Sequence, residues 1–305
     1  MIKLSNNYKI PIICYGTGII NNKMYDSNKF KQFLQRFYLF IKKIIKNDNT
    51  FFNNIGIIKC TKNAIKYNCN FFDTSRAYGK AEYMISRCLK DKERNKYFIC
   101  TKISNSDQLS GKSAKDVLNQ SLKELNVEYI DVLLLHWPVE GTYLKYWKEM
   151  EELYKDGKVK SIGVSNCKIH HLQEIKKIAS VMPMINEVEL HPLLTEIELR
   201  KYCMNNNIKI MAYTSTARGD FRLKSSRRLQ NLCKKYNKSL NQLILRWHIQ
   251  NGIIPIFNTS SLKHFKDNMN IFDFEISDDD MEIIEGMNIN SRTRYDSDNC
   301  EFDRL

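Results

Sequence analysis

Glycine, proline and long apolar runs are all scarce in this sequence. Its 305 residues include only 11 Gly and 5 Pro, a composition that argues against long flexible or Pro-rich linkers. No stretch has the length and apolarity of a membrane-spanning helix, and no window resembles a secretory signal. We therefore expect a soluble, cytoplasmic protein with no membrane partner.

Paired cysteines are lacking too. The nine cysteines are odd in number, scattered along the chain and form no C-x-x-C pair. No histidine spacing typical of a metal site accompanies them, so no metal is predicted. We expect reduced thiols that mainly fill the core, as in proteins of a reducing compartment.

A surplus of positive charge is the main compositional bias. The formal net charge is +14, from 48 Lys and Arg against 34 Asp and Glu. A basic surface can bind nucleic acid without any motif, but here basic and acidic residues are interleaved and no clustered basic stripe is present. Nucleic acid is therefore not the expected partner. A positive field instead favours small anionic ligands, including a dinucleotide.

Short β-branched or aromatic runs alternate with longer amphipathic segments through the chain. The predicted strands cover residues 12–16, 70–73, 98–102, 132–136, 161–165, 185–189, 209–213 and 253–256. This alternation is typical of βα units around a parallel sheet. Eight such units fit a (β/α)8 barrel of about 250 residues plus additions better than a doubly wound sheet. We expect one barrel domain over residues 1–305.

Amphipathic patterns predict helices between these strands. Over residues 113–126, Val117, Leu118 and Leu125 keep a 3.6-residue period, and Asp116 in the first turn suits the helix dipole. A second helix is expected over residues 142–159 and should close at Gly157, because glycine is favoured at helix C-termini.

Two segments fall outside the βα pattern. Residues 3–13 alternate around Asn6 and Asn7 and predict a small hairpin that caps the bottom of the barrel. Residues 21–54 fit no βα unit and predict an inserted helical segment. Its amphipathic stretch over residues 30–46 is interpreted as packing against the barrel in preference to docking on a membrane surface.

Four ionisable residues each sit at or just past the end of a short apolar run: Asp73, Tyr78, Lys102 and His136. Taken singly, each has an ordinary explanation as a solvated charge, a packing ring or a core histidine. In a barrel, however, the carboxyl ends of all strands meet at one face, where catalytic residues lie. The fourfold coincidence predicts that these side chains converge.

Their chemistry suits the reduction of a carbonyl group. The alkoxide that forms needs a proton, and a positioned acid supplies it about 10²–10⁴-fold better than water. Tyr78 is the natural acid, and Lys102 is expected to lower its pKa by stabilising the phenolate. Asp73 would hold the charge on Lys102. His136 would orient the substrate oxygen or share the proton, with its other ring nitrogen fixed by a partner that the sequence does not identify.

The sequence closely resembles the aldo-keto reductase family in seven ordered segments: FFDTSRAYGKAE, FICTKIS, YIDVLLLHWPV, DGKVKSIGVSNC, INEVELHPLL, KIMAYTSTARGD and PIFNTSSLKHFKDNMNIFDFEIS. The resemblance runs nearly end to end, interrupted chiefly by residues 21–54. It implies a (β/α)8 fold and NAD(P)H-dependent reduction of aldehydes or ketones. It also implies that the family's catalytic tetrad falls on the same four residues.

The resemblance further implies a cofactor site and a substrate pocket. The nicotinamide carboxamide would be held by Ser165, Asn166 and Glu187, and the nicotinamide ring would stack on Tyr213. The remaining cofactor positions would be Thr17, Arg218, Asn258, Thr259, His264 and Asn268, with Asn268 at the adenine. The substrate pocket would include Gly18, Ala77 and Trp137.

Several of these positions depart from the family pattern. Glu187 replaces the usual Gln and adds a negative charge that would favour oxidised nicotinamide. Asn258 and His264 replace the Lys and Arg that grip the 2′-phosphate, so the choice between NADPH and NADH stays open unless Lys263 or Arg218 supplies the missing charge. Residues 214–216 replace the usual Ser-Pro-Leu, and Gly18 replaces a Trp common in the substrate pocket.

Two functions of different class therefore remain. The first is a monomeric reductase acting on a small carbonyl substrate, with Tyr78 as general acid. The second is a catalytically weak or inactive cofactor-binding regulatory or interaction protein on the same fold, since the grip on the dinucleotide is weakened. Retention of all four tetrad residue types favours the enzyme.

Overall fold

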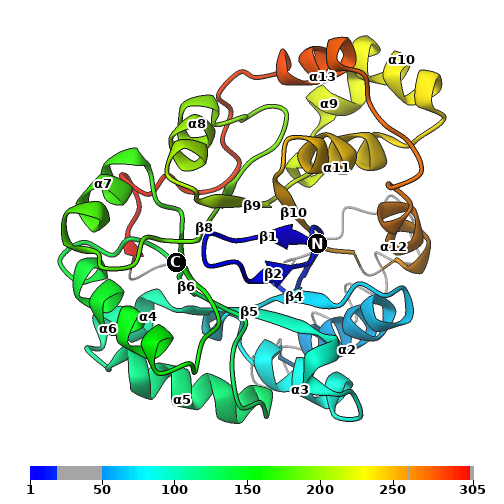
Figure 1. The fold of residues 1–305 in the computed structure, drawn as a ribbon. Helices are drawn as coiled ribbons and strands as arrows, with labels where there is room; N and C mark the ends of the chain where they lie inside the picture. The colour runs from blue at the N-terminus through cyan, green and yellow to red at the C-terminus, as the bar shows by residue number, and fades with distance from the viewer. Residues whose placement is uncertain (19–49, 260, 303–305) are drawn as a thin grey trace, which may run out of the picture.

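The computed structural model describes residues 1–18, 50–259 and 261–302. Eight parallel strands close into a barrel in the order β10-β3-β4-β5-β6-β7-β8-β9, and helices surround it (Figure 1). The strands are β3 (Cys14–Gly16), β4 (Phe71–Asp73), β5 (Phe98–Ile103), β6 (Val132–Leu135), β7 (Ile162–Ser165), β8 (Ile185–Glu189), β9 (Lys209–Tyr213) and β10 (Ile254–Phe257). The predicted barrel is confirmed, although β3 begins two residues later than expected.

Helices connect successive strands, as the sequence pattern predicts. They are α2 (Thr50–Lys66), α3 (Ala81–Leu89), α4 (Asn105–Leu109), α5 (Ala114–Leu125), α6 (Tyr143–Lys155), α7 (Ile169–Ile178), α8 (Ile197–Asn205), α9 (Phe221–Ser225), α10 (Arg227–Tyr236), α11 (Leu240–Gln250), α12 (Leu262–Met269) and α13 (Asp278–Glu285). Three short 3₁₀ turns, η1 (Arg76–Tyr78), η2 (Arg94–Lys96) and η3 (Ala217–Gly219), lie in the loops. None of the described helices is long and apolar enough to cross a membrane.

The two helices singled out from the sequence form for the expected reasons. Helix α5 begins where the Ser113 side chain accepts a hydrogen bond from the backbone N–H of Asp116, and it buries Val117 and Leu118. Helix α6 ends at Lys155, two residues before the predicted Gly157, which adopts a positive φ of 72°. Glycine therefore follows the helix end instead of forming it.

The N-terminal hairpin closes the bottom of the barrel. Strands β1 (Ile2–Lys3) and β2 (Lys9–Ile10) pair antiparallel and lie across the barrel's centre in Figure 1. The Asn6 side chain donates to the carbonyl of Lys160 at 2.8 Å, and the Tyr8 hydroxyl donates to Asp131 at 2.6 Å. Both partners precede strands, at the amino-terminal ends of β7 and β6, so the predicted cap is confirmed.

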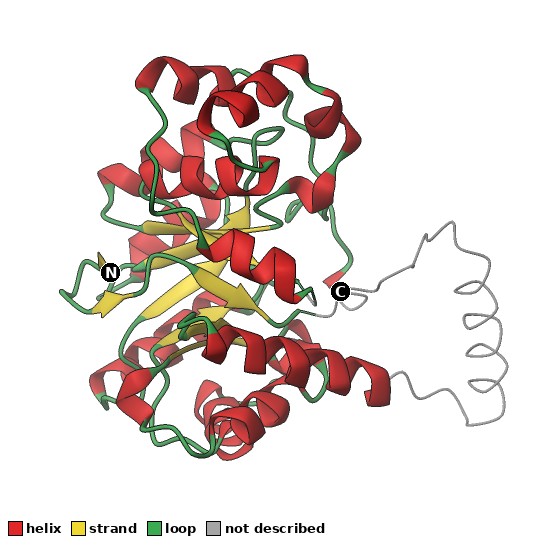
Figure 2. Ribbon diagram, turned by 90° about the vertical axis from the view of Figure 1, so that its right-hand side faces the viewer, coloured by secondary structure: helices red, strands yellow, loops and turns green. Residues whose placement is uncertain are grey.

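The C-terminal segment lies at the opposite end, where the strands finish (Figure 2). The backbone N–H of Thr293 donates to Glu189 on β8 at 2.8 Å, and the Phe302 ring packs edge-on against Trp137, which follows β6. This segment therefore covers the face to which the ionisable strand ends point.

Most of the predicted insertion, residues 21–54, lies outside the described residues. Its expected boundary at residue 54 is wrong, because α2 already begins at Thr50 and continues to Lys66. The cysteine prediction is confirmed, since all nine thiols are free and six of them are buried.

Candidate active site

A buried ion pair between Lys102 and Asp73 lies at the centre of the site. Asp73 ends β4 and Lys102 lies on the adjacent strand β5, so the two side chains meet at the carboxyl face of the barrel. The Lys102 ammonium pairs with Asp73 and donates to the carbonyl of Thr74 at 3.1 Å. Burial alone would lower the pKa of Lys102, but Asp73 and Glu187 hold it well above its ordinary value. The predicted pair is present, and the ammonium stays charged.

Glu187 joins this pair from β8. Its Oε2 lies 3.3 Å from the Lys102 ammonium, and its side chain is only 3% exposed. Burial, followed by the negative charge of Asp73, raises the pKa of Glu187 to about 8 against the opposing effect of Lys102. The family resemblance implies that Glu187 holds a cofactor amide, and the structure adds its contact with the Asp73–Lys102 ion pair.

Tyr78 lies above the ion pair on the turn η1. Ser75 caps this turn by accepting a hydrogen bond from the backbone N–H of Ala77 at 3.1 Å. The Lys102 ammonium lies 5.5 Å from the centre of the Tyr78 ring. Desolvation raises the pKa of Tyr78, and the charge of Lys102 opposes this rise only in part. The expected influence of Lys102 is present, but the net shift runs opposite to the expected lowering.

His136 completes the group from the end of β6. Its ring lies edge-on to Tyr78 with centroids 5.7 Å apart. Burial, then the charges of Lys102 and Arg294, lower the pKa of His136 to about 3, so the ring is neutral at physiological pH. Its Nδ1 lies 3.2 Å from the Ser75 hydroxyl oxygen, which supplies the partner that the sequence left unidentified.

The positions expected at the nicotinamide carboxamide form one hydrogen-bonded network. The Asn166 amide donates to the carbonyl of His136 at 3.0 Å and to the Ser165 hydroxyl at 3.1 Å. The Tyr213 hydroxyl donates to the Asn166 side-chain oxygen at 2.7 Å. Ser165 in turn donates to the carbonyl of Glu187 at 2.9 Å. The structure therefore brings these four residues together, beside the tetrad.

The end of β3 carries two further predicted residues. Both the N–H and the hydroxyl of Thr17 donate to the carbonyl of Asp73 at 2.9 Å. A side-chain carbon on Gly18 would lie 3.5 Å from the Tyr78 ring, so a large residue there would crowd the tyrosine. The amide of Asn258 donates to the carbonyl of Gly18 at 3.1 Å, which joins β10 to this loop.

The positions expected farther along the dinucleotide are more dispersed. Arg218 and His264 are exposed, and the Thr259 hydroxyl accepts from the backbone N–H of Ser261 at 3.2 Å. Asn268 is only 5% exposed. On the substrate side, Ala77 is exposed at the mouth of the barrel. Trp137 is 7% exposed because the Phe302 ring lies 6.3 Å from it.

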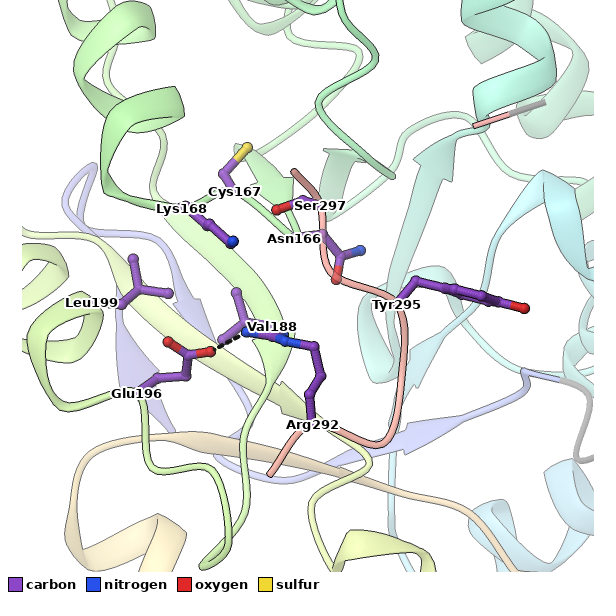
Figure 3. Close-up of a pocket in the computed structure, with 9 residues that line it drawn as sticks. All are labelled: Asn166, Cys167, Lys168, Val188, Glu196, Leu199, Arg292, Tyr295 and Ser297. Carbon is purple, nitrogen blue, oxygen red and sulfur yellow. Dashed lines mark hydrogen bonds and ion pairs between the residues drawn. The ribbon is translucent and has the colours of Figure 1, made fainter. Parts of the chain in front are cut away.

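A polar hollow lies beside Asn166, under the C-terminal segment (Figure 3). Its cations are already paired. Arg292 donates to Glu196 at 2.6 Å, and Lys168 contacts Asp296 at 2.5 Å and Asp298 at 2.7 Å. These pairs tie the C-terminal segment to the barrel and leave the hollow without an unbalanced positive charge.

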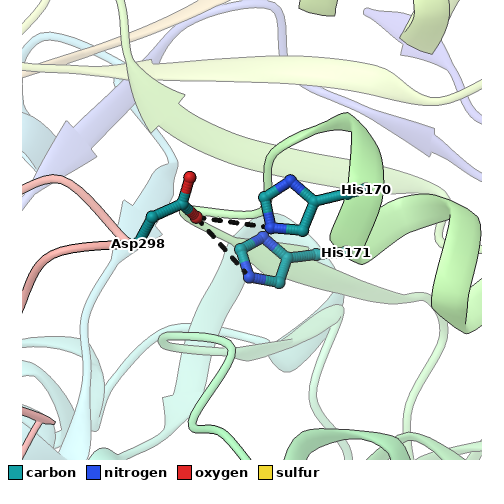
Figure 4. Close-up of side chains that lie close together, drawn as sticks. All are labelled: His170, His171 and Asp298. Atoms are coloured by element: carbon teal, nitrogen blue, oxygen red, sulfur yellow. Dashed lines mark ion pairs between the residues drawn. The ribbon is translucent and has the colours of Figure 1, made fainter.

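His170, His171 and Asp298 also lie close together, with one potential ligand atom from each within 4.8 Å of the others (Figure 4). However, Nδ1 of His171 accepts a hydrogen bond from the backbone N–H of Lys168 at 3.2 Å. A neutral His171 then carries its proton on Nε2, the nitrogen that faces Asp298, and that nitrogen is not available to a metal. The cluster fastens the C-terminal segment to α7.

Sequence reasoning missed Ser75 and Phe302. A serine just before a short helical turn is a recognisable cap signal in the segment DTSRAY. That signal predicts a turn, but it does not predict the contact with His136, which lies 61 residues away. Nothing in the local pattern around Phe302 indicates that it packs on Trp137.

Comparison with known proteins gives a consistent result. A family model described as "Aldo/keto reductase family" matches residues 45–289. The uncharacterized oxidoreductase YtbE of Bacillus subtilis (strain 168) is 38% identical over 252 residues, covering 81% of this chain and 89% of that protein. Glyoxal reductase of the same organism is 37% identical over 243 residues, covering 79% and 87%. The crystal structure of a Gox0644 mutant in complex with NADPH superposes with a TM-score of 0.81 at 26% identity, covering 98% of both chains.

Proposed function

Since the chain belongs to the aldo/keto reductase family and is an NAD(P)H-dependent carbonyl reductase, we propose that its four converging ionisable residues catalyse the proton transfer of that reaction. They are Asp73, Tyr78, Lys102 and His136. The observation that carries the proposal is their continuous contact: the ion pair lies under the Tyr78 ring, and that ring lies against His136. Convergence of this kind favours an enzyme over the regulatory alternative.

The described residues fit a bound dinucleotide. Oε2 of Glu187 is buried and accepts no hydrogen bond from the described residues, and Asn268 is only 5% exposed. We propose that Glu187, with Ser165 and Asn166, holds the nicotinamide carboxamide while the ring stacks on Tyr213. Asn268 would bind the adenine. The bound cofactor supplies the hydride, and its orientation is set by these contacts.

Tyr78 is proposed to donate its proton to the substrate oxygen. Its raised pKa keeps the hydroxyl protonated at physiological pH, ready to donate. The Lys102 ammonium then stabilises the phenolate that remains, since it lies 5.5 Å from the ring centre. Asp73 keeps that ammonium charged and fixed in place.

His136 is proposed to act as a neutral hydrogen-bond donor. With a pKa lowered to about 3, it carries no charge during turnover. The Ser75 hydroxyl already accepts a hydrogen bond from Ala77 and has its own hydrogen free to donate to Nδ1 of His136. This places the ring proton on Nε2, where it can hold the carbonyl oxygen beside the Tyr78 hydroxyl.

We propose that the enzyme uses NADPH and NADH with little discrimination. Charged donors are what select a 2′-phosphate, but Asn258 uses its amide on the carbonyl of Gly18 and His264 is an exposed imidazole. Arg218 and Lys263 are exposed and are the two replacements for this charge that the sequence offers.

A small, reactive dicarbonyl is the proposed substrate. Glyoxal reductase is among the similar proteins, and Gly18 leaves the Tyr78 ring open on the side that a tryptophan would fill. Trp137 and Phe302 would form the apolar wall opposite. The nine free thiols suit the proposed cytoplasmic location.

The proposal is tested by mixing purified protein with NADPH and glyoxal, and separately with NADH, while following absorbance of the reduced nicotinamide. Oxidation of the cofactor that depends on glyoxal is expected with both dinucleotides. Tight binding of either dinucleotide with no oxidation, with glyoxal or with an aromatic aldehyde, would instead support the regulatory alternative.

A further inference from the structure

Glu187, Asp73 and Lys102 form a buried cluster with an uneven charge. The cluster holds two carboxyl groups and one ammonium, with relative exposures of 2%, 4% and 0%. Carboxylate oxygens of Asp73 and Glu187 lie within 4.8 Å of each other. If all three groups were ionised, one negative charge would remain uncompensated in the barrel. Two carboxylates that share one dry site do not both ionise readily.

The contacts indicate which carboxyl group keeps the proton. Asp73 has the closest contact with the ammonium, whose second donor serves the carbonyl of Thr74. Glu187 has only a 3.3 Å ion-pair contact, and its Oε2 accepts no hydrogen bond. The carboxyl oxygens of Glu187 and Asp73 lie within 4.8 Å of each other, and a proton on one of the two groups relieves their mutual repulsion.

Lys102 is the cation in contact with this cluster, while Arg294 acts on the neighbouring His136 and Tyr213. The other titratable groups whose pKa responds to Glu187 are Cys14, Tyr78, Cys100 and Tyr213. Burial raises the pKa of each of these thiols and phenols, so they are neutral at physiological pH. His136 is neutral as well, because burial lowers its pKa to about 3. Asp73 and Lys102 are therefore the charged groups closest to the Glu187 carboxyl group.

We propose that Glu187 is a protonated carboxylic acid in the free enzyme and in its complex with reduced dinucleotide, and that binding of the oxidised dinucleotide expels this proton to solvent. The inference rests on the proposed function, which puts the nicotinamide against Glu187. The reduced ring is neutral and matches the neutral acid. The oxidised ring is cationic and is stabilised by the carboxylate, so Glu187 couples the redox state of the cofactor to pH.

The direction of the pH effect follows from the pKa of Glu187, which burial and Asp73 raise to about 8. Below that pH, binding of NADP⁺ must release a proton, so its affinity rises with pH by up to about tenfold per unit. Above that pH, Glu187 is already ionised and the affinity levels off. Binding of NADPH releases no proton from Glu187 at any of these pH values.

Isothermal titration calorimetry measures this directly. Wild type and Glu187→Gln are titrated with NADP⁺ and NADPH near pH 7 in two buffers of different ionisation enthalpy, which gives the number of protons released. In wild type, NADP⁺ is expected to release close to one proton more than NADPH. Glu187→Gln should remove that difference, while Tyr78→Phe should keep it because the phenol is not the proton source.

The outcomes separate this inference from the proposed function. The role of Glu187 is overturned if wild type releases equal numbers of protons with both dinucleotides, or if the difference persists in Glu187→Gln. In either case, dinucleotide binding and turnover still support the reductase. Failure to bind either dinucleotide overturns both. If Glu187→Gln does not fold, the wild-type calorimetry and the pH dependence of NADP⁺ affinity decide the question alone.

Discussion

The hydroxyl oxygen of Ser75 lies 3.2 Å from Nδ1 of His136, the contact that is proposed to place the ring proton on Nε2. Ser75→Ala removes this contact, so the His136 ring proton can move from Nε2 to Nδ1, where it cannot hold the substrate oxygen. We expect kcat/KM to fall by about fivefold, the equivalent of one hydrogen bond of about 1 kcal/mol, with dinucleotide affinity unchanged. Steady-state kinetics and dinucleotide titration check this.

Ser113→Ala is the matched control for that variant. Ser113 also caps a helix, accepting from the backbone N–H of Asp116 at 3.1 Å at the start of α5, but it does not contact the tetrad. It should reduce thermal stability slightly and leave kcat/KM intact. A similar loss of activity in both variants would mean that Ser75 acts only by capping.

Lys102 should matter for stability as well as for catalysis. In Lys102→Met, Asp73 and Glu187 remain buried beside each other without a cation. Breaking a buried pair from one side is expected to reduce the free energy of unfolding by about 3–5 kcal/mol, and activity should be lost. Denaturant unfolding is the measurement. Lys155→Met, which removes an exposed contact with Glu152, should leave unfolding unchanged, and a Lys102→Met protein as stable as that control would contradict the account.

His248 should make the fold sensitive to acid. It is fully buried, its Nε2 lies 2.9 Å from the carbonyl of Ser215, and burial lowers its pKa to about 3. Between that value and the ordinary histidine pKa of about 6.5, the unfolded chain binds one more proton than the folded chain. Stability from this group is therefore complete above about pH 6.5 and is lost as the pH falls.

The test is the pH dependence of unfolding free energy from about pH 4 to 7. His248→Gln should flatten the curve across that range relative to wild type. His264→Gln, at an exposed histidine on α12, should leave the curve as it is. If the unfolding free energy depends on pH equally in wild type and His248→Gln, His248 is charged in the folded protein.

Position 264 should control the choice of cofactor. In His264→Arg, a permanent charge replaces an exposed imidazole near the expected 2′-phosphate. A charged hydrogen bond contributes about 1.5–3 kcal/mol, so NADPH should bind at least about tenfold more tightly while NADH binding stays the same. Fluorescence titration measures the dissociation constants of NADPH and NADH. His170→Arg adds the same charge elsewhere, and an equal gain there would point to a general field effect.

The arrangement of the tetrad was predictable because its signals are local. Asp73, Lys102 and His136 each follow an apolar run, and the barrel polarity alone directs such strand ends to one face. Most predicted strand positions therefore agree closely with the structure. Strand β3 is shorter than predicted, starting at Cys14, because the residues before it belong to the connection from the hairpin.

Contacts between distant segments were not predictable in the same way. The position of Glu187 beside Lys102 depends on how β8 faces β5 across the barrel, and a sequence pattern carries no such distance. The net rise in the pKa of Tyr78 is a balance between desolvation and one charge, which only the geometry settles. The packing of Phe302 on Trp137 likewise joins residues that no periodicity connects.

The central claim is that Tyr78 is the proton donor. The most direct measurement is single-turnover oxidation of bound NADPH by glyoxal in Tyr78→Phe, with Tyr83→Phe, at a 41% exposed tyrosine on α3, as control. We predict that Tyr78→Phe binds NADPH with nearly unchanged affinity and reacts about 10²–10⁴-fold more slowly, while the control reacts at the wild-type rate. A wild-type rate in Tyr78→Phe would contradict the account.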